Sequence, residues 1–307
     1  MRETEQETEQ EAEREADCGK LFIGARQVVT CAGPARARRG GEMNDIGIRV
    51  DACVAVRNGK IVAVGTESEL AADFADSERV DCAGGVLTPG LIDSHTHAVF
   101  ARPRYEEQEM RAAGVGYMEI ARRGGGIHSS VRDLRAIGED ELLALTHERL
   151  ARLASYGTTT IEIKSGYGLS VEDEIKSLRV VARLQVETNL RLVPTWLGAH
   201  EIPVEYRERS NGRAAYVELL INEMLPRVVS GGLARFADVF CEPGVFTVGE
   251  TRAILQASAA AGLATKLHAD ELEPCGGAEL AASLGATSAD HLAAISREGI
   301  GALAASK

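Results

Sequence analysis

The feature that most limits the fold of this chain is a repeated order of strand, loop and helix that begins after Pro89. Apolar, β-rich runs predict six strands, and the segments between them have the apolar spacing of amphipathic helices. Repeated units of this size are typical of a parallel α/β architecture, either a barrel or an open sheet. The strands are predicted over 90–98, 158–164, 190–197, 236–241, 264–268 and 286–291, and the helices over 139–155, 172–187, 213–228, 247–261 and 276–284.

The sequence before these repeats has a different residue pattern. Short β-rich runs between Lys20 and Val86 are punctuated by Gly and Asn, and Asn58-Gly59 is a hairpin signal because both residues tolerate the positive φ of a type I′ turn. The first residues alternate Glu with other polar residues and offer little to bury, so we expect disorder there. The predicted organisation is a disordered acidic leader over 1–18, a small all-β domain over 19–88 and an α/β domain over 89–307.

Charge and hydropathy exclude several classes of function. The net charge of −12 argues against a nucleic-acid partner, which needs clustered Lys and Arg. No apolar run approaches the roughly 18–20 residues that cross a bilayer, and the N-terminus has no apolar signal region. The six cysteines form no C-x-x-C pair, which is typical of reduced thiols in the cytoplasm. We therefore expect a cytoplasmic protein with a small-molecule partner and no membrane; a homodimer is compatible with the sequence.

The strongest chemical signal is the run PGLIDSHTHAVF, which places His95 and His97 at the end of a predicted strand. Side chains at i and i+2 of a strand point to the same face, so the two imidazoles form half of a metal site. His268, in KLHADE, closes a later strand and is a natural third nitrogen ligand. The three residues predict a site for one divalent metal, Zn or Fe, which would lower the pKa of a bound water to about 7.

Further candidates lie at the ends of other predicted strands. Glu271 follows His268 by three residues, and its carboxylate could carry a proton between the attacking water and the substrate. His200 and His291 each end a strand and could orient the substrate or polarise its carbonyl. His128 and His147 fall in a predicted loop and helix, and for these two we expect structural roles.

Several motifs carry a family resemblance. P-G-L-I-D-S-H-T-H, the later H-A-D-E and a following D-H resemble the mononuclear branch of the amidohydrolase superfamily, and the strand FADVFCE lacks the lysine of binuclear relatives. Within that branch the chain is similar to the imidazolonepropionase family, from about residue 85 to residue 307. The runs that carry this similarity are ARRGGGI at 121–127, SYGTTTIEIKSGYGL at 155–169, LGAHEIP at 197–203 and KLHADE at 266–271.

The resemblance implies both a fold and an activity. The fold would be a TIM-like (β/α)8 barrel, here with about six of eight units, plus a small N-terminal β-sandwich-like domain. The activity would be hydrolysis of the ring C–N bond of 4-imidazolone-5-propanoate to N-formimidoyl-L-glutamate in L-histidine degradation.

The resemblance also implies roles for single residues. His95, His97 and His268 match metal ligands; Arg104, Tyr167, His200 and Glu271 match substrate contacts; and His291 matches a pocket histidine that would act in catalysis with Glu271. The guanidinium of Arg104 suits the propanoate carboxylate, which it could bind through two hydrogen bonds. Tyr167 lies in a Gly-rich loop at a strand exit, and Tyr117 is a further candidate for the pocket.

One departure and two alternatives accompany this reading. The family takes a final metal ligand, an aspartate, from its last barrel strand, and the sequence ends at Lys307, before a seventh strand. We therefore expect a truncated product with weak metal binding and little turnover. The same His and Glu pattern also resembles cytosine deaminase-like aminohydrolases, which would release ammonia. A catalytically inactive binding protein built on an incomplete fold is the other alternative.

Overall fold

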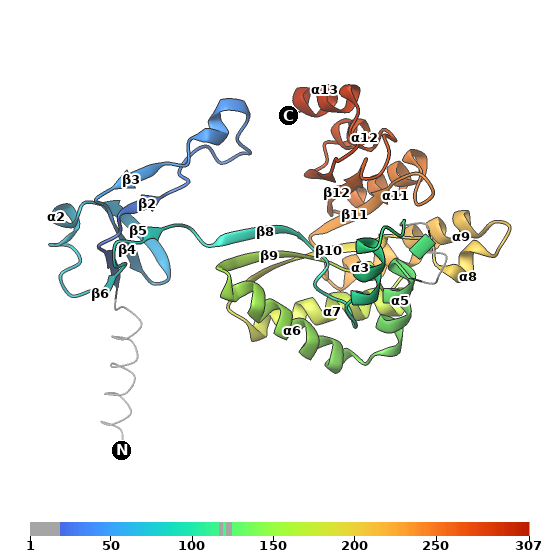
Figure 1. The fold of residues 1–307 in the computed structure, drawn as a ribbon, viewed down its shortest axis with the longest axis horizontal. Helices are drawn as coiled ribbons and strands as arrows, with labels where there is room; N and C mark the ends of the chain where they lie inside the picture. Colours follow the sequence, from blue (N-terminus) through green and yellow to red (C-terminus); the bar gives the residue numbers. More distant parts are fainter. Residues whose placement is uncertain (1–18, 117–118, 121–124, 307) are drawn as a thin grey trace, which may run out of the picture. The chain divides into compact units, whose positions relative to one another are not determined.

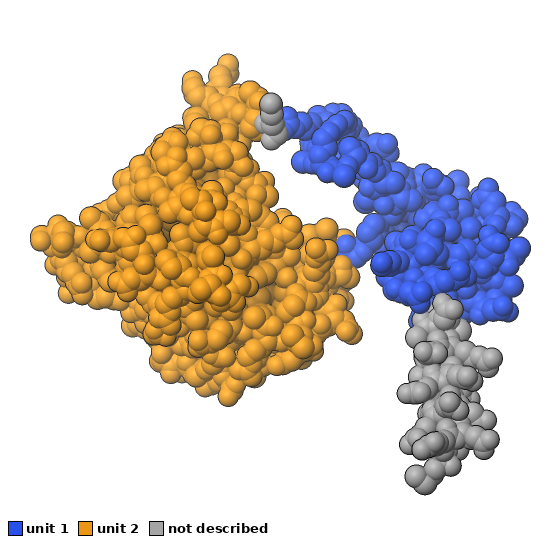
Figure 2. Space-filling model, turned by 180° about the vertical axis from the view of Figure 1, so that it is seen from behind, with its two compact units in different colours: residues 1–90 blue, residues 91–307 orange. Residues whose placement is uncertain are grey.

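The structure is a computed structural model that describes residues 19–116, 119–120 and 125–306. The predicted acidic leader, Tyr117 and part of the ARRGGGI run lie outside the described residues. Two compact units divide between Gly90 and Leu91 (Figure 2), next to the boundary that the sequence predicts after residue 88. No helix among the described residues is long and apolar enough to span a bilayer.

The first unit contains two small sheets, as the sequence predicts. Asn58 and Gly59 both have positive φ and connect an antiparallel pair of strands, which confirms the hairpin. The four-stranded sheet has the order β5-β4-β1-β6, with β5 Lys60–Gly65, β4 Cys53–Arg57, β1 Lys20–Ile23 and β6 Glu78–Asp81. The three-stranded sheet has the order β3-β2-β7, with β3 Ile48–Val50, β2 Gln27–Val29 and β7 Val86–Leu87; the short helices are η1 Gly40–Asn44 and α2 Glu67–Leu70.

The alternation of side chains along β4 builds two apolar clusters in this unit. Cys53 and Ala55 are buried with Leu70 of α2 in one cluster. Val54, which points to the opposite face, is buried with Val28 of β2 in the other. One strand with both faces buried thus serves two cores, as in a small sandwich.

The second unit is built on one parallel sheet of six strands, in the order β13-β12-β11-β10-β9-β8. Each strand pairs with the next along the chain, which is the arrangement of a β/α barrel wall. All six predicted strands are present, although the first ends earlier than predicted. Their bounds are β8 Leu91–Thr96, β9 Thr158–Lys164, β10 Arg191–Ala199, β11 Phe236–Cys241, β12 Ala264–Ala269 and β13 Ser288–His291.

Helices pack against one side of these strands, and Figure 1 shows α6 and α7 lying along β9 and β10. The predicted helices 139–155, 172–187, 247–261 and 276–284 are confirmed within a residue or two. Helices α3, α5, α8 and α13 were not predicted. The bounds are α3 Tyr105–Ala112, α5 Ile127–Ala136, α6 Glu139–Ser155, α7 Val171–Glu187, α8 Val204–Arg207, α11 Val248–Ala260, α12 Gly277–Leu284 and α13 Arg297–Ala305.

The prediction of one regular helix over 213–228 is wrong. The segment is α9 Gly212–Leu219, a π-helical turn η2 Leu220–Met224 and α10 Leu225–Ser230. Pro226 explains the change because it has no N–H to donate and its ring crowds the preceding turn. The helix therefore widens in the turn before the proline and resumes at Leu225, with Pro226 in the first turn of α10.

Charged side chains fill part of the interior of the sheet. Lys164 at the end of β9 is fully buried, and its Nζ lies 2.9 Å from Glu162 Oε1 and 2.7 Å from Asp238 Oδ2. Glu162 and Lys164 share a face because they are two residues apart on a strand. Burial alone would lower the pKa of Lys164, but the two carboxylates outweigh it and raise the pKa, so the ammonium stays charged.

Replacing this ammonium should be costly. Lys164→Met leaves buried Asp238 without its lysine and Glu162 with only the more distant Lys266, and breaking a buried ion pair from one side typically costs about 3–5 kcal/mol in the free energy of unfolding. Urea unfolding followed by the fluorescence of Trp196, the single tryptophan and a buried residue of β10, would measure the loss. Arg252→Met, at an exposed site on α11, is the control and should change stability by at most about 0.5 kcal/mol. Equal stability of the two variants would contradict the prediction.

Candidate metal centre and active site

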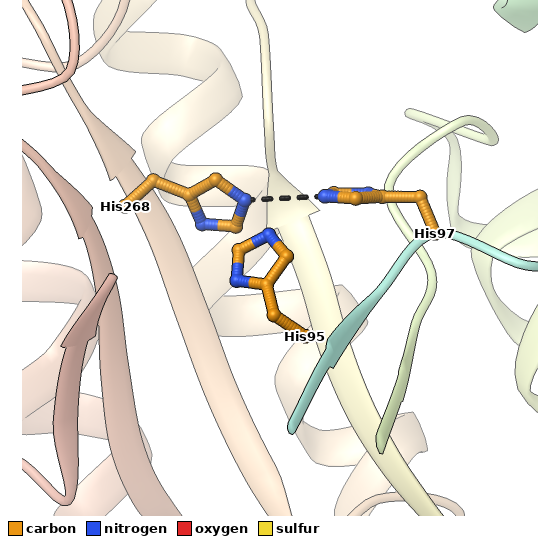
Figure 3. Close-up of side chains that lie close together, drawn as sticks. All are labelled: His95, His97 and His268. Carbon is orange, nitrogen blue, oxygen red and sulfur yellow. Dashed lines mark hydrogen bonds between the residues drawn. The ribbon is translucent and has the colours of Figure 1, made fainter. Parts of the chain in front are cut away.

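Three histidines from two separate strands converge on one point. His95 lies on β8, His97 follows directly after it, and His268 lies on β12. One nitrogen from each ring lies within 4.8 Å of the others, and the Nε2 atoms of His97 and His268 are 3.3 Å apart. Figure 3 shows the three rings turned toward one another. Three strands separate β8 from β12 in the sheet, so the rings meet only because the sheet curves.

The remaining ring nitrogens show how two of these rings are held. His95 Nδ1 lies 2.7 Å from Asp290 Oδ2, and His268 Nδ1 lies 3.1 Å from Asp238. A carboxylate can only accept, so each Nδ1 carries the hydrogen and each Nε2 keeps a lone pair. His97 Nδ1 is buried without a hydrogen-bond partner among the described residues.

These residues fit a divalent cation. Burial, together with the neighbouring rings of His200 and His268, holds the pKa of His97 well below its usual value, so its imidazole is neutral. Neutral imidazoles are ligands for first-row divalent metals, and three protein nitrogens leave a coordination position open. The donor set is that of a catalytic rather than a closed structural site.

A cavity of about 460 Å³ opens above this cluster. The other five predicted site residues that the structure describes all line it, and their roles remain predictions; Tyr117, a further candidate, lies outside the described residues. The lining consists of His97, Arg104, Arg111, Ile127, Tyr167, His200, Phe240, His268, Glu271, Leu272 and His291.

A buried acid fixes the loop that carries Glu271. The carboxylate of Glu242, directly after β11, accepts the backbone N–H groups of Glu271 at 2.9 Å, Leu272 at 3.2 Å and Glu273 at 2.8 Å. The side chain of Glu271 remains directed to the cavity, where its Oε2 lies 3.5 Å from His291 Nε2. A carboxylate and an imidazole at this separation can share a proton.

A second buried acid fixes the loop that carries Tyr167. Glu174 on α7 accepts the backbone N–H groups of Gly166 at 3.1 Å, Gly168 at 2.7 Å and Leu169 at 3.0 Å. Gly166 has φ +108°, and a Cβ there would lie 2.8 Å from the Nδ1 of His200. The loop therefore needs glycine to approach His200.

His200 is a neutral acceptor in this cavity. Its Nδ1 donates to the carbonyl oxygen of Gly166 at 2.9 Å, so its Nε2 carries the lone pair. Burial lowers the pKa of His200 to about 3, with a further contribution from His268. The ring therefore accepts rather than donates through Nε2 near neutral pH.

Sequence reasoning missed the charged residues that support the site, namely the buried Lys164, Glu174, Asp238 and Glu242 and the partly buried Asp290. A signal was available for some of them, because Glu162 and Lys164 alternate with isoleucines inside a predicted strand, where charged residues are rarely buried unless paired. Of the two histidines expected to be structural, His128 lies in the first turn of helix α5 rather than in a loop, and His147 is exposed on α6.

Solved structures share this fold at low sequence identity. Ochratoxinase of A. niger matches with a TM-score of 0.60 and 14% identity, over 94% of this chain and 62% of that chain. A 5-methylcytosine deaminase from Klebsiella pneumoniae matches with a TM-score of 0.57 and 15% identity, over 86% of this chain and 55% of that chain. The predicted barrel of the amidohydrolase kind, with six of its β/α units, is thereby confirmed as the fold.

Relatives with much higher identity have one name in common. The imidazolonepropionase of Symbiobacterium thermophilum is 49% identical over 288 residues, and that of Geobacillus kaustophilus is 49% identical over 286 residues. These alignments cover 92% and 91% of this chain, which spans about two thirds (67%) of the length of each relative. A family model described as an imidazolonepropionase-like composite domain of bacteria matches residues 52–76. The chain therefore belongs to the imidazolonepropionase family.

Proposed function

We propose that this chain binds one divalent metal, zinc or iron, through His95, His97 and His268. We further propose that it hydrolyses the ring C–N bond of 4-imidazolone-5-propanoate to N-formimidoyl-L-glutamate, a step of L-histidine degradation. The observation that carries the proposal is the convergence of three histidine nitrogens within 4.8 Å at a cavity that also contains an acid and an arginine. Relatives at 46–49% identity that are named imidazolonepropionase support the choice of substrate.

The chemistry divides between the metal and the cavity. A bound divalent metal supplies Lewis acidity, which makes water reactive near neutral pH. In the proposed reaction, the water oxygen forms a bond to the ring carbonyl carbon and the C–N bond breaks. Glu271 accepts a proton from the attacking water and delivers it to the departing nitrogen, which would otherwise leave as a poor anionic group. His291, 3.5 Å from Glu271, orients that carboxylate during the transfer.

Other residues of the cavity would hold the substrate. Arg104 would bind the propanoate carboxylate, and its own orientation is supported by Glu107, whose Oε2 lies 3.5 Å from Arg104 Nη1. His200 would accept a ring N–H through Nε2, since its Nδ1–H is already bonded to Gly166. The phenol of Tyr167 would complete the contact from the loop that Glu174 fixes.

The proposal is tested by loading the purified chain with zinc or iron(II) and offering 4-imidazolone-5-propanoate. We expect one equivalent of metal and formation of N-formimidoyl-L-glutamate, with both lost in His268→Gln because one of three nitrogen ligands is removed. His147→Gln, an exposed histidine on α6, is the matched control and should keep both. Ammonia release from aminopyrimidines instead would favour a deaminase, and metal binding without hydrolysis would favour a binding protein.

A change at the acid should separate catalysis from metal binding. Glu271→Gln removes the proton carrier but none of the three histidines, so we expect kcat to fall by about 10²- to 10⁴-fold with the metal content unchanged. Glu273→Gln, an exposed acid in the same loop, serves as the control and should retain the wild-type kcat. Steady-state kinetics and metal analysis of both variants check this. A Glu271→Gln enzyme with wild-type kcat would remove Glu271 from the proposed mechanism.

The neutral state of His200 can be observed directly. With a pKa of about 3 in the folded protein and an ordinary value near 6.5 when unfolded, the ring binds a proton more readily in the unfolded chain. Its contribution to stability is therefore complete above about pH 6.5 and declines as the pH falls toward 3. We expect the His200 ring signals, assigned by comparison with His200→Gln in ¹⁵N-edited NMR spectra, to stay constant between pH 5 and pH 8. A titration with a midpoint near 6.5 would contradict this.

A further inference from the structure

The two acids that hold metal-site histidines share one buried cation. Asp238 accepts from His268 Nδ1 and, through Oδ2, from Lys164 Nζ at 2.7 Å. Asp290 accepts from His95 Nδ1 at 2.7 Å through the same Oδ2 atom that lies 3.5 Å from Lys164 Nζ. The side chains of Lys164 and Asp238 are fully buried, and that of Asp290 is 15% exposed. A single ammonium thus contacts both carboxylates beneath the rings.

This arrangement determines which nitrogen each ring presents. A neutral imidazole can carry its hydrogen on either nitrogen, and only the form with Nδ1–H leaves Nε2 free to bind a metal in this geometry. The acceptors at Asp238 and Asp290 select that form. Outer carboxylates of this kind fix ring orientation and raise the basicity of the ligand.

The carboxylates in turn need the lysine. A carboxylate withdrawn from water without a cationic partner is costly. Lys164 offsets that cost and fixes the positions of both acids, with Nζ 2.7 Å from Asp238 Oδ2 and 3.5 Å from Asp290 Oδ2. Lys266 adds a second cation, with Nζ 3.4 Å from Asp290 and 3.4 Å from Glu162.

The net charge of the lysines and acids beneath the histidine rings also favours a cation at the Nε2 atoms of those rings. Lys164 and Lys266 supply two positive charges, and Glu162, Asp238 and Asp290 supply three negative charges, which leaves a net charge of −1. The excess negative charge lies directly beneath the rings of His95 and His268. A divalent cation held by the Nε2 atoms would therefore be stabilised by attraction to this layer.

We propose that Lys164, Asp238 and Asp290 form a positioning triad, in which the lysine fixes two carboxylates that orient His268 and His95 for binding a divalent metal. The inference rests on the metal site of the proposed function and concerns residues that touch neither the metal nor the substrate. His97 lies outside the triad. Its ring instead stacks on His200 with centroids 5.0 Å apart, so its orientation depends on packing.

The test measures zinc affinity rather than activity. In Asp238→Asn and Asp290→Asn the shape is kept and the charge is removed, and we expect the Kd for zinc to rise by about 10- to 100-fold. A competition titration against a chromophoric chelator gives the Kd, with folding verified by circular dichroism and Trp196 fluorescence. Glu250→Gln is the matched control, since it also removes a partly buried carboxylate, 22% exposed, but one that pairs with Arg213 on α9 rather than with a metal-site histidine or Lys164. Its Kd should stay within about twofold of the wild-type value.

A second readout reports on the rings themselves. In the metal-free protein, ¹⁵N NMR should show the Nδ1–H form for His95, and Asp290→Asn should shift this ring toward a mixture of the two forms. Because Asp290 is partly exposed, this variant removes less buried charge than Asp238→Asn and is the safer one to fold.

The outcomes separate the two proposals. Wild-type protein that binds no zinc would refute the metal site itself. Zinc binding by the wild type with unchanged Kd and unchanged His95 signals in Asp290→Asn, and unchanged Kd in folded Asp238→Asn, would overturn the positioning triad alone.

Discussion

The burial of the Lys164 ammonium among carboxylates is the interaction on which the rest of the α/β unit depends. An ammonium inside a protein is tolerated only with charged partners at hydrogen-bond distance, and here those partners come from β9, β11 and β13. Strands this far apart in the sheet can surround one nitrogen only if the sheet curves. The same curvature brings β8 opposite β12, and with them the three histidines of the metal site. The charged interior and the functional site are therefore two consequences of one shape.

Charged groups and histidine rings occupy two different layers of the site. Below lie paired lysines and acids, and above them lie imidazoles, among which burial keeps His97 and His200 neutral. Protonated histidines would repel both one another and a metal ion, so desolvation at this level assists binding rather than opposing it. The lysines and acids beneath the histidines are charged, and the direct contact between their opposite charges offsets the cost of burying them. The protein thus separates the groups that carry charge from the groups that would donate lone pairs.

Much of the fold could be predicted from sequence because its signals are local. Strands such as β9 and β11 are short apolar runs between turn residues, and the spacing of His95 and His97 places both on one face of a strand whatever the rest of the chain does. The unpredicted features depend on tertiary structure. The π-helical turn before Pro226 interrupts a helix whose apolar spacing is regular. The acids Asp238 and Asp290 contact their histidines only when strands distant in sequence meet. Sequence spacing identifies ligands more readily than the residues that hold those ligands.

The acids around the site show why one of them is suited to chemistry and the others to support. Glu174 and Glu242 each accept three backbone N–H groups, so their oxygens are occupied in holding loops. Asp238 and Asp290 each bind one histidine and contact Lys164. A carboxylate saturated in this way cannot gain a proton without losing those bonds. Among the described residues that line the cavity, Glu271 is the one acid, and its side chain has the imidazole of His291 as a neighbour rather than a set of fixed donors. Its backbone is rigid because Glu242 holds it, while its carboxylate is left able to exchange a proton. Rigid placement of the chain combined with an uncommitted functional group is what a general acid and base requires.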